Sequence, residues 1–297
     1  MLTSFLQPDM FAQPYMQNAL LTGTIVAVLA GLVGFFVVLR GVSFAAHSLA
    51  QIGFAGAAGA VLIGVDPLWG LVLFALGGGV GMGLLGARDH DRDVTTALIL
   101  VASLGVGALF LTLNTSYATA AFSLLFGTIV GIGRVQVWET LALALACLAG
   151  LGALFRPLLL ASVNPELAAA RGIPLRALNV LFLVVVGVAA AVTVPVAGTL
   201  LIFALMVGPA AAATRLTRRP ATALPVAVAL GVLATWLGIT LAYDTGWPVG
   251  FFITALIAVF YVATRVVRPG RARRGVAPVV VQADPRAAGA DDRVVVP

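Results

Sequence analysis

The sequence contains no lysine, because all 17 of its basic side chains are arginine. A Walker A loop uses a lysine to hold nucleotide phosphates, so this chain has no such site, and any ATP-driven work must be done by another subunit. Cysteine occurs once, which excludes an intrachain disulfide and a multi-cysteine metal site. Charged residues make up only 9% of the chain, against about 25% in a soluble domain.

Hydrophobic residues, by contrast, make up 61% of the 297 positions. They form continuous runs of about 20 residues, the length of a membrane-crossing helix, whereas a membrane barrel shows alternating segments of about ten residues. The expected fold class is therefore an all-α polytopic membrane protein. The runs predict nine transmembrane helices, near residues 18–39, 43–63, 68–86, 95–113, 135–155, 178–197, 199–217, 221–242 and 249–265.

Arginine placement predicts the orientation of these spans. If the spans alternate, five arginine clusters fall on one side, at 40, 88–92, 156–176, 215–219 and 265–274. Only Arg134 falls on the other side. Short arginine-rich loops stay in the cytoplasm, so we expect a plasma-membrane protein with its N-terminus outside and its C-terminus inside. The net charge of +6 reflects this orientation and does not indicate nucleic-acid binding.

The two ends of the chain differ from the transmembrane domain at 18–265. Residues 1–17 have no arginine ahead of an apolar segment, unlike a signal peptide, and are expected to form an external segment. Residues 266–297 are rich in Gly, Pro, Ala, Asp and Arg and are expected to form a disordered cytoplasmic tail. The arginines near its start either contact anionic membrane lipid or act as a plain stop-transfer anchor.

Residues 156–176 interrupt the apolar pattern with three arginines, one glutamate and three prolines. Each charge would cost about 2.5–3.5 kcal/mol at the bilayer centre, so this stretch is expected outside the hydrocarbon. Asn164 is expected to cap a short helix that starts at Pro165, with Glu166 in its first turn and Gly172 as its stop. Such a helix is either an ordinary interfacial loop helix or a docking element for a soluble partner.

Within the second span, His47 and Gln51 are four residues apart and share one face of the helix. Ionisable residues inside spans are rare and usually face a cavity, and neutral imidazole is a common transition-metal ligand. The pair is either part of a metal path or a hydrogen-bonded contact with neighbouring helices. Ser48 adjoins His47 but cannot face it from the same helix, so the sequence does not indicate a serine hydrolase.

Gly208 and Pro209 lie inside the seventh predicted span. Proline removes a backbone hydrogen bond and kinks a helix, and the kink frees a carbonyl group. The expected kink serves either helix packing or a hinge and wall of a transport pathway.

With these features together, the chain resembles the permease subunits of the ABC-3 family, which are importers of zinc, manganese or iron. The likeness covers about residues 15–266 and is carried by four stretches, at 37–51, 156–174, 201–216 and 244–250. The second of these is close to the coupling-helix pattern of the family. The second and third together make the resemblance fairly specific.

The resemblance implies a homodimeric permease whose fold is related to that of the vitamin B12 importer permeases. It implies a cytoplasmic ATP-binding cassette ATPase on each coupling helix, near 164–172, and an extracytoplasmic metal-binding protein that delivers the ion. No bound cofactor is implied, because the metal ion is the substrate. The expected ATPase contacts are Asn164, Pro165, Glu166, Arg171 and Gly172.

One departure from the family concerns the second span. Members of the family usually carry Asp and His four residues apart as the metal path, and these fall on His47 and Gln51 of this chain. The spacing survives, but the pair has no negative charge. The resemblance still predicts an importer permease for a divalent transition metal, with a metal chelate or another small solute as the alternative substrate. An intramembrane enzyme or a structural membrane protein is the third class of function.

Overall fold

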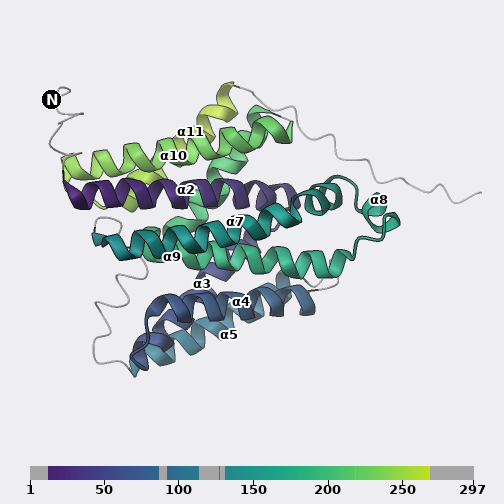
Figure 1. Cartoon of the computed structure of the whole chain (residues 1–297), viewed down its shortest axis with the longest axis horizontal. Coiled ribbons are helices and arrows are strands. Elements are labelled where there is room, and N and C mark those ends of the chain that lie inside the picture. The colour runs from purple at the N-terminus through teal and green to yellow at the C-terminus, as the bar shows by residue number, and fades with distance from the viewer. Residues whose placement is uncertain (1–12, 87–91, 114–126, 128–130, 218, 268–297) are drawn as a thin grey trace, which may run out of the picture.

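The computed structural model describes residues 13–86, 92–113, 127, 131–217 and 219–267, and in these ranges the regular structure is helical (Figure 1). This confirms the expected all-α class. The helices are α2 (Pro14–Arg40), α3 (Ser43–Leu62), α4 (Pro67–Leu85), α5 (Arg92–Thr112), α7 (Arg134–Val163), α8 (Pro165–Ala170), α9 (Leu175–Leu216), α10 (Pro220–Thr245) and α11 (Val249–Val267).

Two predicted boundaries differ from the observed helices. The expected external segment at 1–17 already contains the start of α2, which begins at Pro14 with a proline at its first position. Helix α7 continues beyond the predicted span at 135–155 and ends at Val163, with Pro157 inside it. Pro157 removes one backbone hydrogen bond, yet the helix continues past it. Most of the expected tail, from residue 268 onward, lies outside the described residues.

Eight helical segments of the described chain are long and apolar enough to cross a membrane, and a shorter apolar helix covers Leu201–Leu216. That shorter helix is the second half of α9. The two halves meet at Gly198, whose φ of 79° and ψ of 158° are not helical. The predicted break between the sixth and seventh spans is therefore present, at this glycine.

The first half of α9 packs against the last turns of α2. The guanidinium of Arg40, the last residue of α2, donates a hydrogen bond to Asn179. Slightly further from that end, the rings of Phe36 and Phe182 meet edge to face with centroids 6.5 Å apart. As residue numbers rise in α9 they fall in α2, so this half runs antiparallel to α2.

The second half of α9 packs against the same part of α2 in the opposite direction. A Cβ atom on Gly34 would lie 1.8 Å from the carbonyl oxygen of Met206, so the two backbones are in direct contact. Val38, one turn later, packs against a buried cluster that includes Ala213. This half runs parallel to α2, so the chain reverses at Gly198 and α9 supplies two of the predicted crossings.

Close backbone contact also joins α3 to α4. A Cβ atom on Gly56 would lie 2.1 Å from the carbonyl oxygen of Gly70, and the reverse is also true. Lipid tails are as apolar as leucine, so helices in a bilayer associate through close van der Waals contact, which small residues permit. These glycines fix the spacing of the α3–α4 pair.

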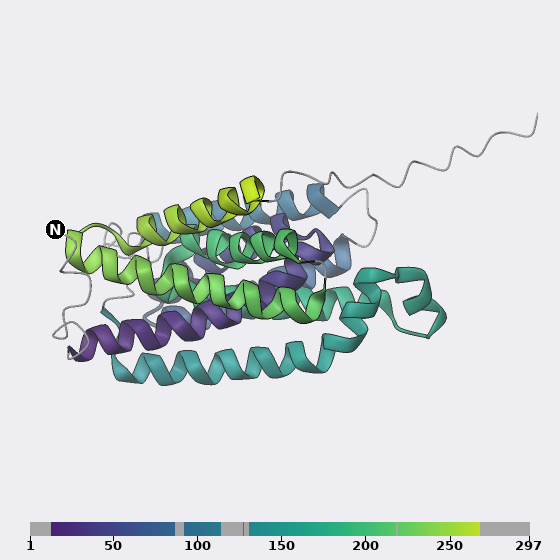
Figure 2. The ribbon, with the colours of Figure 1, turned by 90° about the horizontal axis from the view of Figure 1, so that it is seen from above.

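The bundle has two chemically different ends. Helix α8 projects beyond one end, and α2 begins at the other (Figures 1 and 2). Arg134 starts α7 at the end where α2 begins. The end that carries α8 also holds the described arginines at 40, 156, 171, 176, 215, 219 and 265.

Replacing Gly198 by alanine should destabilise the fold, because φ and ψ at this position are accessible almost only to glycine. We expect a loss of about 1–3 kcal/mol and a lower unfolding temperature of the purified protein. Gly152→Ala is the matched control, because Gly152 lies in α7 and a Cβ atom there would meet nothing within 4 Å. Equal unfolding temperatures for Gly198→Ala and the wild type would contradict the reversal at this residue.

Candidate functional site

Helix α8 is a short helix with well-formed caps at both ends. The Oδ1 atom of Asn164 accepts a hydrogen bond of 2.9 Å from the backbone N–H of Leu167. Pro165 occupies the first helical position and Glu166 lies in the first turn. The predicted cap, start and first-turn acid are therefore all observed. The caps explain how six residues remain helical between two long helices.

The C-terminal end of α8 uses a glycine in the left-handed conformation. Gly172 has a φ of 76°, and its N–H donates to the carbonyl of Ala169. The N–H of Ile173 donates to the carbonyl of Ala168. These two bonds form a Schellman motif, which satisfies the last carbonyl groups and turns the chain toward α9.

Nearly all of α8 is open to solvent. Ala168 is fully buried, whereas Glu166, Arg171 and Gly172 are exposed. Leu167 also leaves 42% of its surface exposed on this projecting helix. The helix therefore offers a carboxylate, a guanidinium and an apolar side chain to any partner at this end of the bundle.

His47 and Gln51 lie near the beginning of α3 and are half-buried. The helix is continuous between them, so they share one face as predicted. The ring of His47 meets that of Phe203 edge to face, with centroids 5.2 Å apart. Its Nδ1 atom is buried without a hydrogen-bond partner among the described residues. His47 therefore touches the second half of α9, the helix that also carries Gly208 and Pro209.

Gly208 and Pro209 lie inside the helix Leu201–Leu216. Backbone angles in α9 leave helical values at Gly198, ten residues earlier, so the break in α9 does not coincide with the Gly-Pro pair. A Cβ atom on Gly208 would lie 2.1 Å from the side chain of Ile257 in α11. This contact gives Gly208 a packing role, and a hinge at Gly208–Pro209 stays a prediction.

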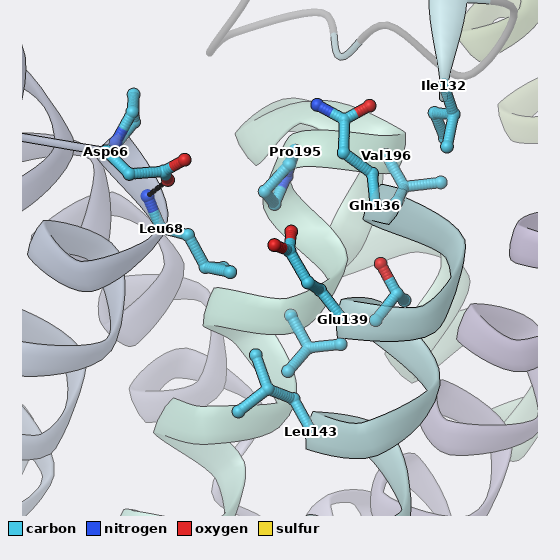
Figure 3. Close-up of a pocket in the computed structure, with 11 residues that line it drawn as sticks. Asp66, Leu68, Ile132, Gln136, Glu139, Leu143, Pro195 and Val196 are labelled. Carbon is cyan, nitrogen blue, oxygen red and sulfur yellow. Dashed lines mark hydrogen bonds between the residues drawn. The ribbon is translucent and has the colours of Figure 1, made fainter. Parts of the chain in front are cut away.

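A pocket of about 240 Å³ opens at the opposite end of the bundle from α8, and Figure 3 shows the residues that line it. It lies between the start of α4, the start of α7 and the end of the first half of α9. Glu139 lies 24 residues before Val163, the last residue of α7, so at about 1.5 Å per residue roughly 36 Å of helix separate it from the start of α8. The lining residues are Asp66, Pro67, Leu68, Ile132, Gln136, Glu139, Thr140, Leu143, Val192, Pro195 and Val196.

The polar groups of this pocket are mostly oxygen atoms. Glu139 points into the pocket from α7, and Asp66 faces it from the other side (Figure 3). Asp66 also caps α4, because its Oδ1 accepts a hydrogen bond of 2.8 Å from the N–H of Leu68. Carboxylate, amide and hydroxyl oxygens suit hard divalent cations such as manganese. His47 and Gln51 do not line this pocket.

Sequence reasoning missed this pocket, although one signal for it existed. Glu139 is an acidic residue inside the predicted span at 135–155, and charged residues inside spans usually face a cavity. Its place in the same pocket as Asp66 depends on the packing of α4 and α7 against the first half of α9. Among the described residues, no three His, Cys, Asp or Glu side chains gather as a metal site within one copy of the chain.

Comparison with known proteins gives a consistent family match. The family model described as the ABC 3 transport family matches residues 12–268. The manganese import system permease protein ScaB of Streptococcus parasanguinis is 28% identical over 86% of this chain and 91% of its own length. The manganese transport system membrane protein MntC of Halalkalibacterium halodurans is 25% identical over 81% of this chain and 84% of its own length.

A solved structure resembles the whole bundle. A chain of PsaBC from Streptococcus pneumoniae, in complex with Fab, superposes with a TM-score of 0.80 at 25% identity. The match covers 91% of this chain and 97% of the solved chain. The overall helix arrangement is therefore shared between the two proteins.

Removing the cap of α8 should loosen this helix without affecting the bundle. Asn164→Ala should cost about 1 kcal/mol locally, so we expect amide hydrogen exchange at Leu167 to become roughly fivefold faster. Asn164→Asp keeps an oxygen acceptor and serves as the control. Unchanged exchange at Leu167 in Asn164→Ala would show that the cap contributes nothing to α8.

Proposed function

Because this chain belongs to the ABC 3 transport family, we propose that it is the permease subunit of an ATP-binding cassette importer for a divalent transition metal ion. Manganese is the ion that we infer first, since the similar proteins ScaB and MntC are both named for manganese. Zinc and iron remain within the proposed substrate class. The ion is a substrate in transit, and no resident cofactor is proposed.

The observation that carries this proposal is the exposed helix α8 at the arginine-rich end of a membrane bundle. A capped helix that projects beyond the bundle supports docking of a soluble ATPase, with Asn164, Pro165, Glu166, Arg171 and Gly172 as its contacts. The positive-inside rule supports a cytoplasmic position for this end. We therefore propose that nucleotide-driven movement of the ATPase enters the permease through α8.

The proposed path begins at the opposite end. An extracytoplasmic metal-binding protein delivers the ion to the outer pocket, where Glu139 and Asp66 attract positive charge. The ion then passes His47 and Gln51, whose imidazole and amide replace part of its water shell. Two copies of the chain form the transporter, and membrane lipid surrounds it. The contact of His47 with Phe203 supports a pathway that involves the second half of α9.

A metal chelate is the second candidate substrate. It is favoured by the neutral character of the His47–Gln51 pair, because a chelated ion brings its own ligands and needs no charged group from the permease. Uptake assays distinguish the two substrates. A free ion enters in simple buffer and is lost to an excess of EDTA, whereas a chelate enters only when its ligand is supplied.

Uptake of radioactive manganese into proteoliposomes, with the co-purifying ATPase and ATP, tests the proposed function. His47→Ala should lower uptake by about tenfold or more, since loss of groups around a metal commonly costs 10–100-fold. Ser48→Ala is the control, because the Ser48 hydroxyl donates to the carbonyl of Phe44 within its own helix α3. Gln51→His adds a second imidazole and should favour zinc over manganese.

Equal uptake by the wild type and His47→Ala, at matched amounts of protein, would remove His47 from the metal path and leave it as a packing residue. Absence of ATP-dependent uptake by the wild type, for the free ions and for supplied chelates alike, would contradict the transport function itself.

Orientation is tested by reporter fusions. Fusions after residues 170 and 217 should report the cytoplasm, and fusions after residues 66 and 245 should report the outside. The physical reason is the concentration of arginine at the end that carries α8. A cytoplasmic signal at residue 66 would contradict the proposed topology.

A further inference from the structure

The last residue of α2 links α9 to the beginning of α3. Arg40 ends α2, and only Gly41 and Val42 separate it from α3. The Nη2 atom of Arg40 donates a hydrogen bond to Oδ1 of Asn179, and its guanidinium lies 5.4 Å from the ring centroid of Phe182. Both partners belong to the first turns of α9, which follow α8 directly. Arg40 therefore contacts the part of α9 that α8 would move first.

Helix α7, which precedes α8, contacts the same end of α2. Helix α7 leads into α8, and the ring of Phe155 in α7 contacts that of Phe36 edge to face at 5.4 Å. Phe36 also contacts Phe182 of α9 and is fully buried. The helices on either side of α8 are thus joined to the last turns of α2 by aromatic contacts and by Arg40.

The connection from α2 to α3 is short and held by hydrogen bonds. Gly41 adopts a left-handed φ of 70°, and the N–H of Val42 donates to the carbonyl of Val37 over 3.0 Å. A displacement of the end of α2 therefore carries the start of α3 with it. His47 lies about one turn inside α3, so it lies close to this connection.

A small cavity lies beside the contact of Arg40 with Asn179 and Phe182. The cavity has a volume of about 90 Å³, and its lining includes Arg40, Asn179 and Phe182, Phe44 and Ala45 of α3, and the carboxylate of Asp93 in α5. The side chains of Arg40, Asn179 and Phe182 therefore face the same space as the beginning of α3. They have room to shift relative to each other without displacing a close-packed core.

We propose that Arg40 is a positioning residue that transmits movement of α8, through Asn179 and Phe182, to the start of α3 and the His47–Gln51 pair. The inference rests on the proposed transport function. The guanidinium is suited to this task because it makes a charge-assisted hydrogen bond and stacks on an aromatic ring with the same planar group. Its position at the C-terminus of α2 is also favoured by the helix dipole.

The test measures manganese uptake and ATP hydrolysis in the same proteoliposomes, with the permease bound to its co-purifying ATPase. Arg40→Gln should leave ATP hydrolysis within about twofold and lower the manganese imported per ATP by about fivefold or more, the usual size of a coupling effect. Asn179→Leu should act in the same direction and less strongly, because the stacking on Phe182 remains. The double variant should be no worse than Arg40→Gln alone, because both changes break one link.

Two further variants separate transmission from simple stability. Arg215→Gln removes another arginine at the same end, which lies 5.2 Å from the ring centroid of Tyr261, and should leave the manganese imported per ATP unchanged. Arg40→Lys combined with Asn179→Asp restores a charge-assisted contact and should recover most of the ratio. A ratio in Arg40→Gln equal to that of the wild type would overturn the inference, as would additive losses in the double variant. Wild-type vesicles that import nothing would instead contradict the proposed function.

Discussion

Inside a bilayer no water is available to pair with backbone N–H and C=O groups, so every peptide group in the hydrocarbon must find its partner within the protein. Long helices meet this requirement, and the described chain consists almost entirely of them. A break in a helix leaves backbone groups without partners, which costs free energy in a bilayer, so each break that persists indicates a structural or functional need. The described interruptions between spans include the glycine reversal at Gly198, the Gly41 connection and the capped helix α8. Each one lies where the proposed transport cycle needs either a change of direction or a contact surface.

The same constraint governs how the helices associate. Burial of apolar surface drives little association between helices in lipid, so stability comes from close contact of backbones at small residues. Gly56 with Gly70 and Gly34 with Met206 bring whole helices into contact without an intervening side chain. A contact of this kind has almost no room for sliding. Movement in the transporter must therefore take the form of helix pairs that shift as units, with change confined to the connections between them.

Features that depend on residues close together in the sequence were predictable, whereas features that depend on the packing of distant helices were not. The span pattern, the cap at Asn164 and the stop at Gly172 depend on neighbouring residues, and all were predicted. The break between the sixth and seventh spans was placed within a few residues of Gly198, because Pro195 and Gly198 stand close together in an apolar run. The outer pocket was missed, since Glu139 and Asp66 line one pocket only after α4, α7 and α9 have packed. A kink was predicted at Gly208–Pro209 because proline removes a backbone hydrogen bond. The observed break in α9 instead lies at Gly198, ten residues before Gly208.

The strength of the contact between Arg40 and Asn179 determines how easily it can be broken and formed again. A hydrogen bond to a charged group contributes about 1.5–3 kcal/mol, whereas breaking a buried ion pair costs about 3–5 kcal/mol. The hydrogen bond that Arg40 donates to Asn179 is of the weaker kind, which suits a contact that is made and released in the proposed transport cycle. A carboxylate at this position would hold the same geometry more tightly and resist the change of state. Phe182 adds an attraction through its ring face, which tolerates displacement of the guanidinium better than a directional hydrogen bond does. The contacts of Arg40 with Asn179 and Phe182 are thus each weak enough to be broken and formed again, as the proposed transmission of movement requires.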